Sequence, residues 1–256
     1  MKKNDQNKIN AMQSAGLALG TILCELLKLS TAGISLKEIE ALAMAKILQS
    51  GGKPSFTTVG NYKWATCLCV NDVIVHGIPT EYVLKDQDVL TIDIGMLRDG
   101  FHTDTAWSKV IGNPQKEVKQ FLEVGEKALW SAIDMARAGN RVGHISKSIQ
   151  DVVSPYGYGI VRSLVGHGVG KTLHEAPQIP GILKGKIEKT PELVEGMTIA
   201  IEVIYTMGSP KMVYVNDDGW SIGTKDGSLT AVFEHTVAIT DGEPLVLTHS
   251  AGSGLS

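Results

Sequence analysis

The chain has 256 residues, of which 43% are hydrophobic and 20% charged, a composition that excludes a mainly disordered protein. Lys and Arg number 24 against 27 Asp and Glu, so the net charge of −3 provides no basic excess for binding a nucleic-acid backbone. The three cysteines, at 24, 67 and 69, do not form a disulfide framework. They favour buried free thiols in a reducing compartment, so we expect a cytoplasmic protein.

The first half of the chain is predicted to begin with two helices and a strand. Residues 8–29 carry apolar side chains at helical spacing, interrupted by charged residues that argue against a signal peptide or a membrane span. Ser35 is placed to cap a second helix that runs to about residue 49, with Glu38 as its capping-box partner. Residues 65–75 are rich in Val, Ile, Leu and Cys and are predicted to form a strand.

A hairpin is predicted next, followed by helices and short strands. Its two strands cover residues 88–97 and 101–111 and are joined by Asp99-Gly100, a strong hairpin signal. A second signal of this kind lies at Asp226-Gly227. The remaining elements are predicted as helices at 115–137 and 143–153 and as short strands from 158 onward.

A short pattern occurs twice. The pattern Ala-Gly-x-x-Leu-x-x-Ile at 32–39 recurs as Ala-Gly-x-x-Val-x-x-Ile at 138–145. In both places a long helix precedes it, a second helix follows, and strands come next. The repeat predicts a single α+β domain over residues 1–256, made of similar halves at about 8–112 and 113–248.

Two aspartates stand inside the predicted hairpin, although Asp is disfavoured in strands. With the turn at 99–100, Asp104 lies opposite Gly95, and Asp93 projects from the same face two residues away. Two carboxylates this close repel each other unless a cation or proton lies between them. The alternative is a pair of solvated aspartates on an edge hairpin, which the apolar neighbours Ile92 and Ile94 make less favourable.

The second half repeats this oddity with Glu202 and Glu234, each set in a run of β-branched and apolar residues. A buried Glu is almost never left unpaired, and a salt bridge is its usual partner. Two of them beside two buried Asp leave too few nearby cations, because Arg98 and Lys225 lie in turns. The four carboxylates therefore predict a cation site.

Histidines add nitrogen donors to this set. His167 lies in Gly-His-Gly-Val-Gly, where glycines permit close approach of the backbone, and His174 follows seven residues on. A lone His is more often structural, but two beside four carboxylates favour one metal ligand and one catalytic or supporting group. His76 ends a strand at the expected rim of the site. We expect His102 and His144 to have structural roles only. We expect His235 to support Glu234.

Four carboxylates and one imidazole suit two divalent ions, such as Fe, Mn, Co or Zn, bridged by shared carboxylates. Two ions ~3.5–4 Å apart generate hydroxide at neutral pH and polarise a carbonyl. The sequence has no Gly-x-Ser-x-Gly elbow, Walker phosphate loop or His-Glu-x-x-His motif. From its residues, the chain is predicted to be a dinuclear metallohydrolase.

These residues lie in short motifs spread in order over about residues 8–248. The motifs are Val75-His76-Gly77-Ile78-Pro79, Ile92-Asp93, Asp99-Gly100-Phe101-His102-x-Asp104, Gly166-His167-Gly168-Val169-Gly170, His174-Glu175-x-Pro177, Gly196-Met197-Thr198, Ile201-Glu202 and Glu234-His235. The series resembles the type I methionine aminopeptidases. The resemblance implies the pita-bread fold, a pseudo-two-fold antiparallel sheet flanked by two pairs of helices. It also implies removal of the initiator methionine from nascent proteins whose second residue is small, by attack of metal-activated hydroxide on the first peptide bond.

The resemblance also implies roles for individual residues. The implied ligands of two divalent ions are Asp93, Asp104, His167, Glu202 and Glu234. Asp104 and Glu234 would bridge the ions, and Glu202 would shuttle a proton. His174 would hydrogen-bond the scissile carbonyl, and His76 would steer the peptide beyond the cleaved bond.

The resemblance places the methionine pocket as well. Its implied lining is Tyr62, Cys67, Leu173 and Trp220 together with His76 and His174, although Cys67 is equally expected as plain core. Five residues depart from the family pattern, at Val59, Lys63, Leu173, Val203 and Val232. None is a ligand, so the departures bear on pocket shape and rate.

The implied partners are the N-termini of nascent polypeptides, with a ribosome contact near the exit tunnel. We expect a monomer with no nucleic-acid or membrane partner. Two alternatives remain open: an Xaa-Pro aminopeptidase, which usually has an extra N-terminal domain, and a non-enzymatic relative, which usually lacks ligands. Because residue 2 is Lys, too large for the implied specificity, Met1 is predicted to remain on the mature protein.

Overall fold

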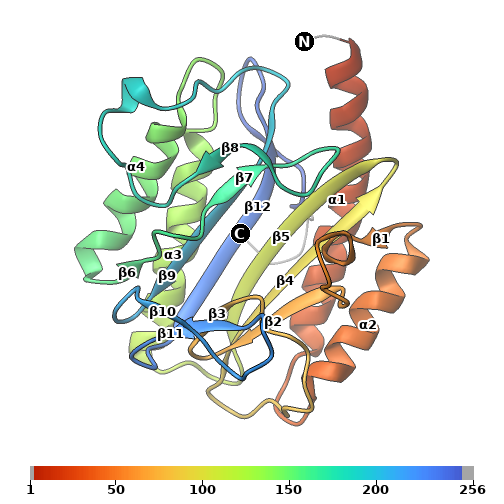
Figure 1. The fold of residues 1–256 in the computed structure, drawn as a ribbon, viewed down its shortest axis with the longest axis vertical. Helices are drawn as coiled ribbons and strands as arrows, with labels where there is room; N and C mark the ends of the chain where they lie inside the picture. The colour runs from red at the N-terminus through yellow and green to blue at the C-terminus, as the bar shows by residue number, and fades with distance from the viewer. Residues whose placement is uncertain (1–2, 250–256) are drawn as a thin grey trace.

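The computed structural model describes residues 3–249, and its centre is an antiparallel sheet with four helices packed beside it (Figure 1). The helices are α1 (Lys3–Leu29), α2 (Leu36–Gln49), α3 (Lys116–Asp134) and α4 (Val142–Val153), with 3-10 turns η1 (Phe56–Thr58), η2 (Ser154–Tyr156) and η3 (Ile187–Lys189). The strands are β1 (Lys53–Pro54), β2 (Thr66–Val70), β3 (Val73–Val75), β4 (Val89–Arg98), β5 (Phe101–Val110), β6 (Gly159–Ile160), β7 (Gly166–Gly168), β8 (Glu175–Ile179), β9 (Thr198–Thr206), β10 (Met212–Tyr214), β11 (Ile222–Thr224), β12 (Thr230–Ala238) and β13 (Leu245–Val246). The prediction for Met1 lies outside the described residues.

The main sheet has the strand order β1-β4-β5-β12-β9-β7-β8, with β2, β6 and β13 paired at its sides. Helix α1 packs on β4 and β5, and α3 packs on β9 and β12. The core between helices and sheet includes Ile92, Trp107, Val203 and Phe233. Because successive strand residues alternate between faces, their polar neighbours project from the opposite face. The α+β class is as predicted.

The predicted helix starts and stops are close to the observed ones. Helix α1 begins at Lys3, earlier than predicted, and ends at the predicted residue. The capping box of α2 is confirmed: the Glu38 N–H donates to Ser35 Oγ at 3.3 Å, and the Ser35 N–H donates to Glu38 Oε2 at 2.8 Å. Asp5–Leu29 is long and apolar enough to cross a membrane, but 56% of its most apolar window is buried, as in a core helix.

Of the two predicted hairpins, the one at Asp99-Gly100 is confirmed and the one at Asp226-Gly227 is wrong. At Asp99-Gly100 both residues have positive φ, 53° and 81°, and β4 pairs with β5 in the predicted register. At Gly227 the chain also turns, with φ 69°, but the flanking strands do not pair. Strand β11 joins the small sheet β10-β11-β3, whereas β12 enters the main sheet. A turn residue fixes only the local backbone, and packing decides the strand partners.

The strand predicted at 65–75 is divided into β2 and β3. Asn71, between them, has a φ of 57°, a conformation that Asn tolerates and that ends an extended strand. Strand β2 pairs with β4 in the main sheet, and β3 pairs with β11 in the small one. His76 follows β3, and the chain then returns to the main sheet, where the Leu68 N–H of β2 donates to Gly77 O at 2.8 Å.

The repeated pattern corresponds to a repeated structure. Gly33 and Gly139 follow α1 and α3 with positive φ, 99° and 86°. The Gly33 N–H donates to Leu84 O at 2.9 Å, and the Gly139 N–H donates to Leu193 O at 3.0 Å. In each half, a hydrogen bond thus joins the turn between the two helices to the segment just before the long strand, β4 or β9.

Candidate active site

Strand register sets three carboxylates in a row across the centre of the sheet. Asp93 on β4 and Glu234 on β12 both lie opposite Ala106 on β5, and Glu234 also lies opposite Glu202 on β9. Residues paired in this way share a face of the sheet. The row therefore runs over four strands, with the small Ala106 leaving space between Asp93 and Glu234.

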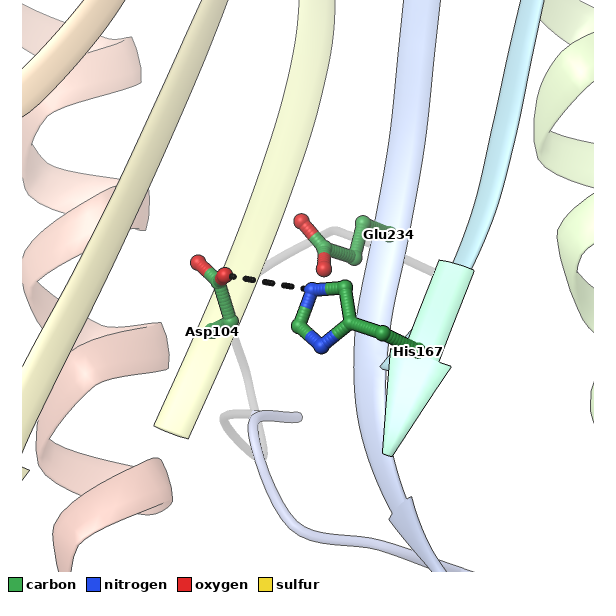
Figure 2. Close-up of side chains that lie close together, drawn as sticks. All are labelled: Asp104, His167 and Glu234. Atoms are coloured by element: carbon green, nitrogen blue, oxygen red, sulfur yellow. Dashed lines mark ion pairs between the residues drawn. The ribbon is translucent and has the colours of Figure 1, made fainter. Parts of the chain in front are cut away.

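Asp104 and His167 complete the cluster from the adjacent rows. Asp104 lies opposite Gly95, as predicted, and two residues from Ala106 on the same face of β5. His167 Nε2 lies 3.9 Å from Asp104 Oδ2 and 3.4 Å from Glu202 Oε1. Figure 2 shows Asp104, His167 and Glu234 pointing toward one another, and their donor atoms lie within 4.8 Å of each other.

The chemistry of the cluster suits bound cations. Asp93 Oδ1, Asp104 Oδ1 and Glu234 Oε1 are buried oxygens without a hydrogen-bond partner. Burial raises the pKa of Asp93, Asp104, Glu202 and Glu234 well above the usual range, and mutual repulsion raises it further. Within residues 3–249, no ion pair joins these carboxylates to Lys or Arg. Buried oxygens that repel one another fit divalent ions, which take carboxylate ligands.

His167 is oriented as a nitrogen donor. Its Nδ1 lies 2.8 Å from Gly168 O, so a proton on Nδ1 leaves Nε2 free to face the carboxylates. Burial lowers the pKa of His167 to about 4. The ring is therefore neutral near pH 7, which is the form that binds metals.

A cavity of about 340 Å³ opens over the carboxylates. Every residue predicted for the site lines it: Tyr62, Cys67, His76, Asp93, Asp104, His167, Leu173, His174, Glu202, Trp220 and Glu234. The His174 ring meets the His167 ring edge-on, with 4.5 Å between centroids. Partial desolvation at the cavity wall lowers the pKa of both His174 and His76, and the neighbouring His174 lowers the pKa of His76 further. Both rings are neutral near pH 7.

The other end of the cavity is apolar and aromatic. Tyr62 packs edge-on against Trp220 at 5.1 Å and Phe56 at 6.3 Å between ring centroids. Leu173 and Cys67 are buried in the same cluster. Cys67 on β2 lies opposite Asp93 on β4, so the apolar end of the cavity adjoins the carboxylates. Cys67 is thus both buried and part of the cavity wall.

Comparison with known proteins identifies the family. The profile of metallopeptidase family M24 matches residues 10–241. The chain belongs to metallopeptidase family M24.

Several proteins similar to this M24 metallopeptidase are named methionine aminopeptidase. The methionine aminopeptidase of Clostridium perfringens is 37% identical over 95% of this chain and 97% of its own length. Methionine aminopeptidase 1 of Bacillus subtilis is 41% identical over 91% of this chain and 93% of its own length. The crystal structure of a methionine aminopeptidase from Thermotoga maritima superposes with a TM-score of 0.91, at 37% identity, over 95% of this chain and 97% of that one.

A more distant structure shares the fold alone. Prolidase from Pyrococcus furiosus is 22% identical and superposes with a TM-score of 0.77, over 96% of this chain and 64% of that one. These similarities confirm the predicted pita-bread fold. The M24 chain is a hydrolase with divalent metal cofactors, as predicted.

Sequence reasoning missed part of the cavity wall of this M24 enzyme. The missed residues are Phe56, Val75, Ser163, Leu164, Val165 and Ile204. Alternation along β9 could have found Ile204, which lies two residues after Glu202 on the same face. No local pattern marks Phe56 or the segment 163–165, because apolar residues in loops are usually ordinary packing.

The prediction for His235 is wrong. It follows Glu234 on β12, so its side chain projects from the opposite face of the sheet. There its Nδ1 lies 2.9 Å from Thr248 Oγ1, and its ring packs near Trp107 and Trp130.

The two histidines predicted to be structural have local partners. His102 Nδ1 lies 2.9 Å from Ser55 Oγ. His144 Nδ1 accepts from the Arg141 N–H at 2.9 Å at the start of α4.

Proposed function

We propose that this M24 metallopeptidase is a methionine aminopeptidase that removes the initiator methionine from polypeptides whose second residue is small. The observation that carries the proposal is the two-ended cavity. One end holds the carboxylates with His167 and His174, and the other is walled by Phe56, Tyr62 and Trp220. An apolar pocket with aromatic edges suits a thioether side chain, whose sulfur gains ~0.3–1.5 kcal/mol from such contacts.

The metal ligands in this proposal are Asp93, Asp104, His167, Glu202 and Glu234. Asp104 and Glu234 stand on the adjacent central strands β5 and β12, which suits shared ligands between two ions. Divalent ions supply hydroxide at neutral pH and polarise the scissile carbonyl. Oxygen donors with one imidazole nitrogen suit Fe, Mn, Co or Zn in this role.

The remaining polar groups are proposed to act on the peptide. Neutral His174 can donate its ring N–H to the scissile carbonyl oxygen as negative charge develops there. The Glu202 carboxylate, in the same cluster, can take up a proton and pass it to the leaving amine. His76 lines the same cavity near His174 and is proposed to orient the residue that follows the cleaved bond.

Two other functions give different results in a simple test. The purified, metal-loaded protein is expected to cleave Met-Ala-Ser and to leave Ala-Pro-Ala intact. Cleavage of Ala-Pro-Ala alone would support an Xaa-Pro aminopeptidase. Absence of any cleavage by protein shown to hold metal would support a binding protein without peptidase activity.

The setting of the enzyme is part of the same proposal. We place it in the cytoplasm as a monomer with one domain of two similar halves. Its substrates would be nascent chains leaving the ribosome, met at the exit tunnel. Intact-mass analysis of the protein itself, which should retain Met1 before Lys2, checks the rule of a small second residue.

A further inference from the structure

A row of apolar side chains leads from the cavity to the surface along the small sheet β10-β11-β3. Val75 on β3 lines the cavity, Ile222 on β11 lies opposite Val75, and Tyr214 on β10 lies opposite Ile222. Since register partners share a face, the three side chains follow one another away from the cavity. In Figure 1 this sheet lies across one end of the central strands.

Exposure rises along the row. Val75 and Ile222 are half-buried, whereas Tyr214 is 76% exposed, the highest value for a large apolar residue among residues 3–249. Single exposed apolar residues are common and carry little meaning alone. The position of Tyr214, continuous with the proposed active site, is what distinguishes it.

The strand that bears Tyr214 is held against the cavity wall. Met212, two residues earlier on the same face, packs against a buried cluster that includes Ile204. Val75 and Leu164 pack against the same cluster, and both line the cavity together with Ile204. The main-chain bond from Val215 N–H to Ser221 O at 2.9 Å closes the loop after β10. The phenol ring is therefore presented from an anchored strand.

We infer that Tyr214 contacts the fourth and fifth residues of the substrate peptide and favours apolar side chains there. This inference rests on the proposed function. Two strand spacings of ~4.8 Å separate Val75 from Tyr214, about 10 Å in all. An extended peptide covers that distance in about three residues, at ~3.3–3.6 Å each. With the second substrate residue beside His76 and Val75, the fifth residue reaches Tyr214.

The test compares peptides that can and cannot reach this position. Met-Ala-Ser is too short, whereas Met-Ala-Ser-Leu-Leu and Met-Ala-Ser-Ser-Ser differ only at the fourth and fifth residues. We expect the metal-loaded enzyme to cleave the Leu-containing pentapeptide with a kcat/KM about threefold to tenfold higher than the Ser-containing one, mainly through KM. Tyr214→Ser should reduce that ratio to near one and leave Met-Ala-Ser unchanged within about twofold.

Val213→Ser is the matched control, because Val213 is 37% exposed on the opposite face of the same strand and should keep the wild-type ratio. Equal cleavage of the two pentapeptides by wild type would overturn the inference while leaving the proposed function intact. The inference would also be overturned if Tyr214→Ser lost as much kcat/KM on Met-Ala-Ser as on the pentapeptides. A lowered ratio between the two pentapeptides in Val213→Ser would overturn it as well. Failure of wild type to cleave Met-Ala-Ser would refute the proposed function itself, and the inference with it.

Discussion

At the scale of single residues, the proposed chemistry depends on neutral imidazoles next to carboxylates that repel one another. His174 lies edge-on to His167 at the cavity wall, and burial holds its pKa below the usual value. A neutral ring carries one N–H donor and changes charge little when a substrate binds. Such a donor stabilises a transition state more than a ground state.

His174→Ala is accordingly expected to lower kcat on Met-Ala-Ser by roughly 10²–10³ with a smaller change in KM. Steady-state kinetics on metal-loaded protein of both forms provide the measurement, with metal content determined in parallel. A rise in KM without loss of kcat would instead assign His174 to ground-state binding.

Leu173 is the departure from the family pattern closest to the reacting groups. It is only 4% exposed and packs among Phe56, Tyr62 and Cys67. A larger ring at this position must take its volume from the cavity, with an overpacking cost of ~1–3 kcal/mol. The aromatic contacts already come from Phe56, Tyr62 and Trp220.

Leu173→Phe should therefore tighten discrimination of Met over Leu or norleucine at the first substrate residue, by a modest factor. It should change kcat on Met-Ala-Ser by less than about tenfold, roughly 1.4 kcal/mol. Matched tripeptides beginning with Met, norleucine and Leu give the ratios. An unchanged or lower Met:Leu ratio would show that Leu173 does not shape the pocket.

At the scale of secondary-structure elements, helix α2 fixes the strand that carries the pocket. The Glu40 carboxylate accepts the Ala65 N–H at 2.7 Å and both the N–H and the hydroxyl of Thr66, at 3.0 and 2.6 Å. Thr66 O in turn accepts the Tyr62 hydroxyl at 2.8 Å. One helix side chain thus sets the start of β2 and, through it, the positions of Tyr62 and Cys67.

Glu40→Gln should lower the free energy of unfolding by about 1–3 kcal/mol, because an amide N–H₂ would face backbone N–H donors. Burial raises the pKa of Glu40 in the folded protein, so its stabilising contribution is greatest at low pH and decreases as pH rises through that pKa. Urea unfolding at about pH 4 and pH 7 measures both forms. The difference between wild type and variant should narrow toward pH 7, and a widening difference would contradict the assignment.

At the scale of the whole molecule, the proposed metal ligands join the two halves. Asp93 and Asp104 come from the first hairpin, and His167, Glu202 and Glu234 come from the second half. Without a cation, the four carboxylates repel one another across the junction of β5 and β12. Metal binding should therefore stabilise the entire fold, because it involves both halves.

Adding Mn²⁺ or Co²⁺ to chelator-treated protein at 100 times its Kd should stabilise it by about 2.7 kcal/mol. For a chain of this size that raises Tm by roughly 5–10 °C. Asp104→Asn should show a much smaller rise and little turnover, while the exposed Asp241→Asn should behave as wild type. A full metal-induced rise and wild-type turnover in Asp104→Asn would remove Asp104 from the ligand set.

The sequence alone determined the features that are encoded within a few residues. The Asp99-Gly100 turn set Asp104 opposite Gly95, and Ser35 with Glu38 marked the start of α2. Acidic residues inside apolar strands identified a cation site, because burying an unpaired carboxylate is too costly to occur without a function. These inferences need only turn geometry, alternation and the chemistry of single side chains.

The tertiary structure decided everything that depends on pairing between distant segments. Thr105 Oγ1 donates to Glu234 O at 2.8 Å, 129 residues away, and this β5–β12 contact brings Asp93 and Glu234 into one row. Phe56 and residues 163–165 line the cavity because the fold brings these distant segments together. Strand β11 pairs in the small sheet rather than with β12, despite the turn at Gly227. Such register is set by burying both halves against a shared core, a requirement that no short stretch of sequence contains.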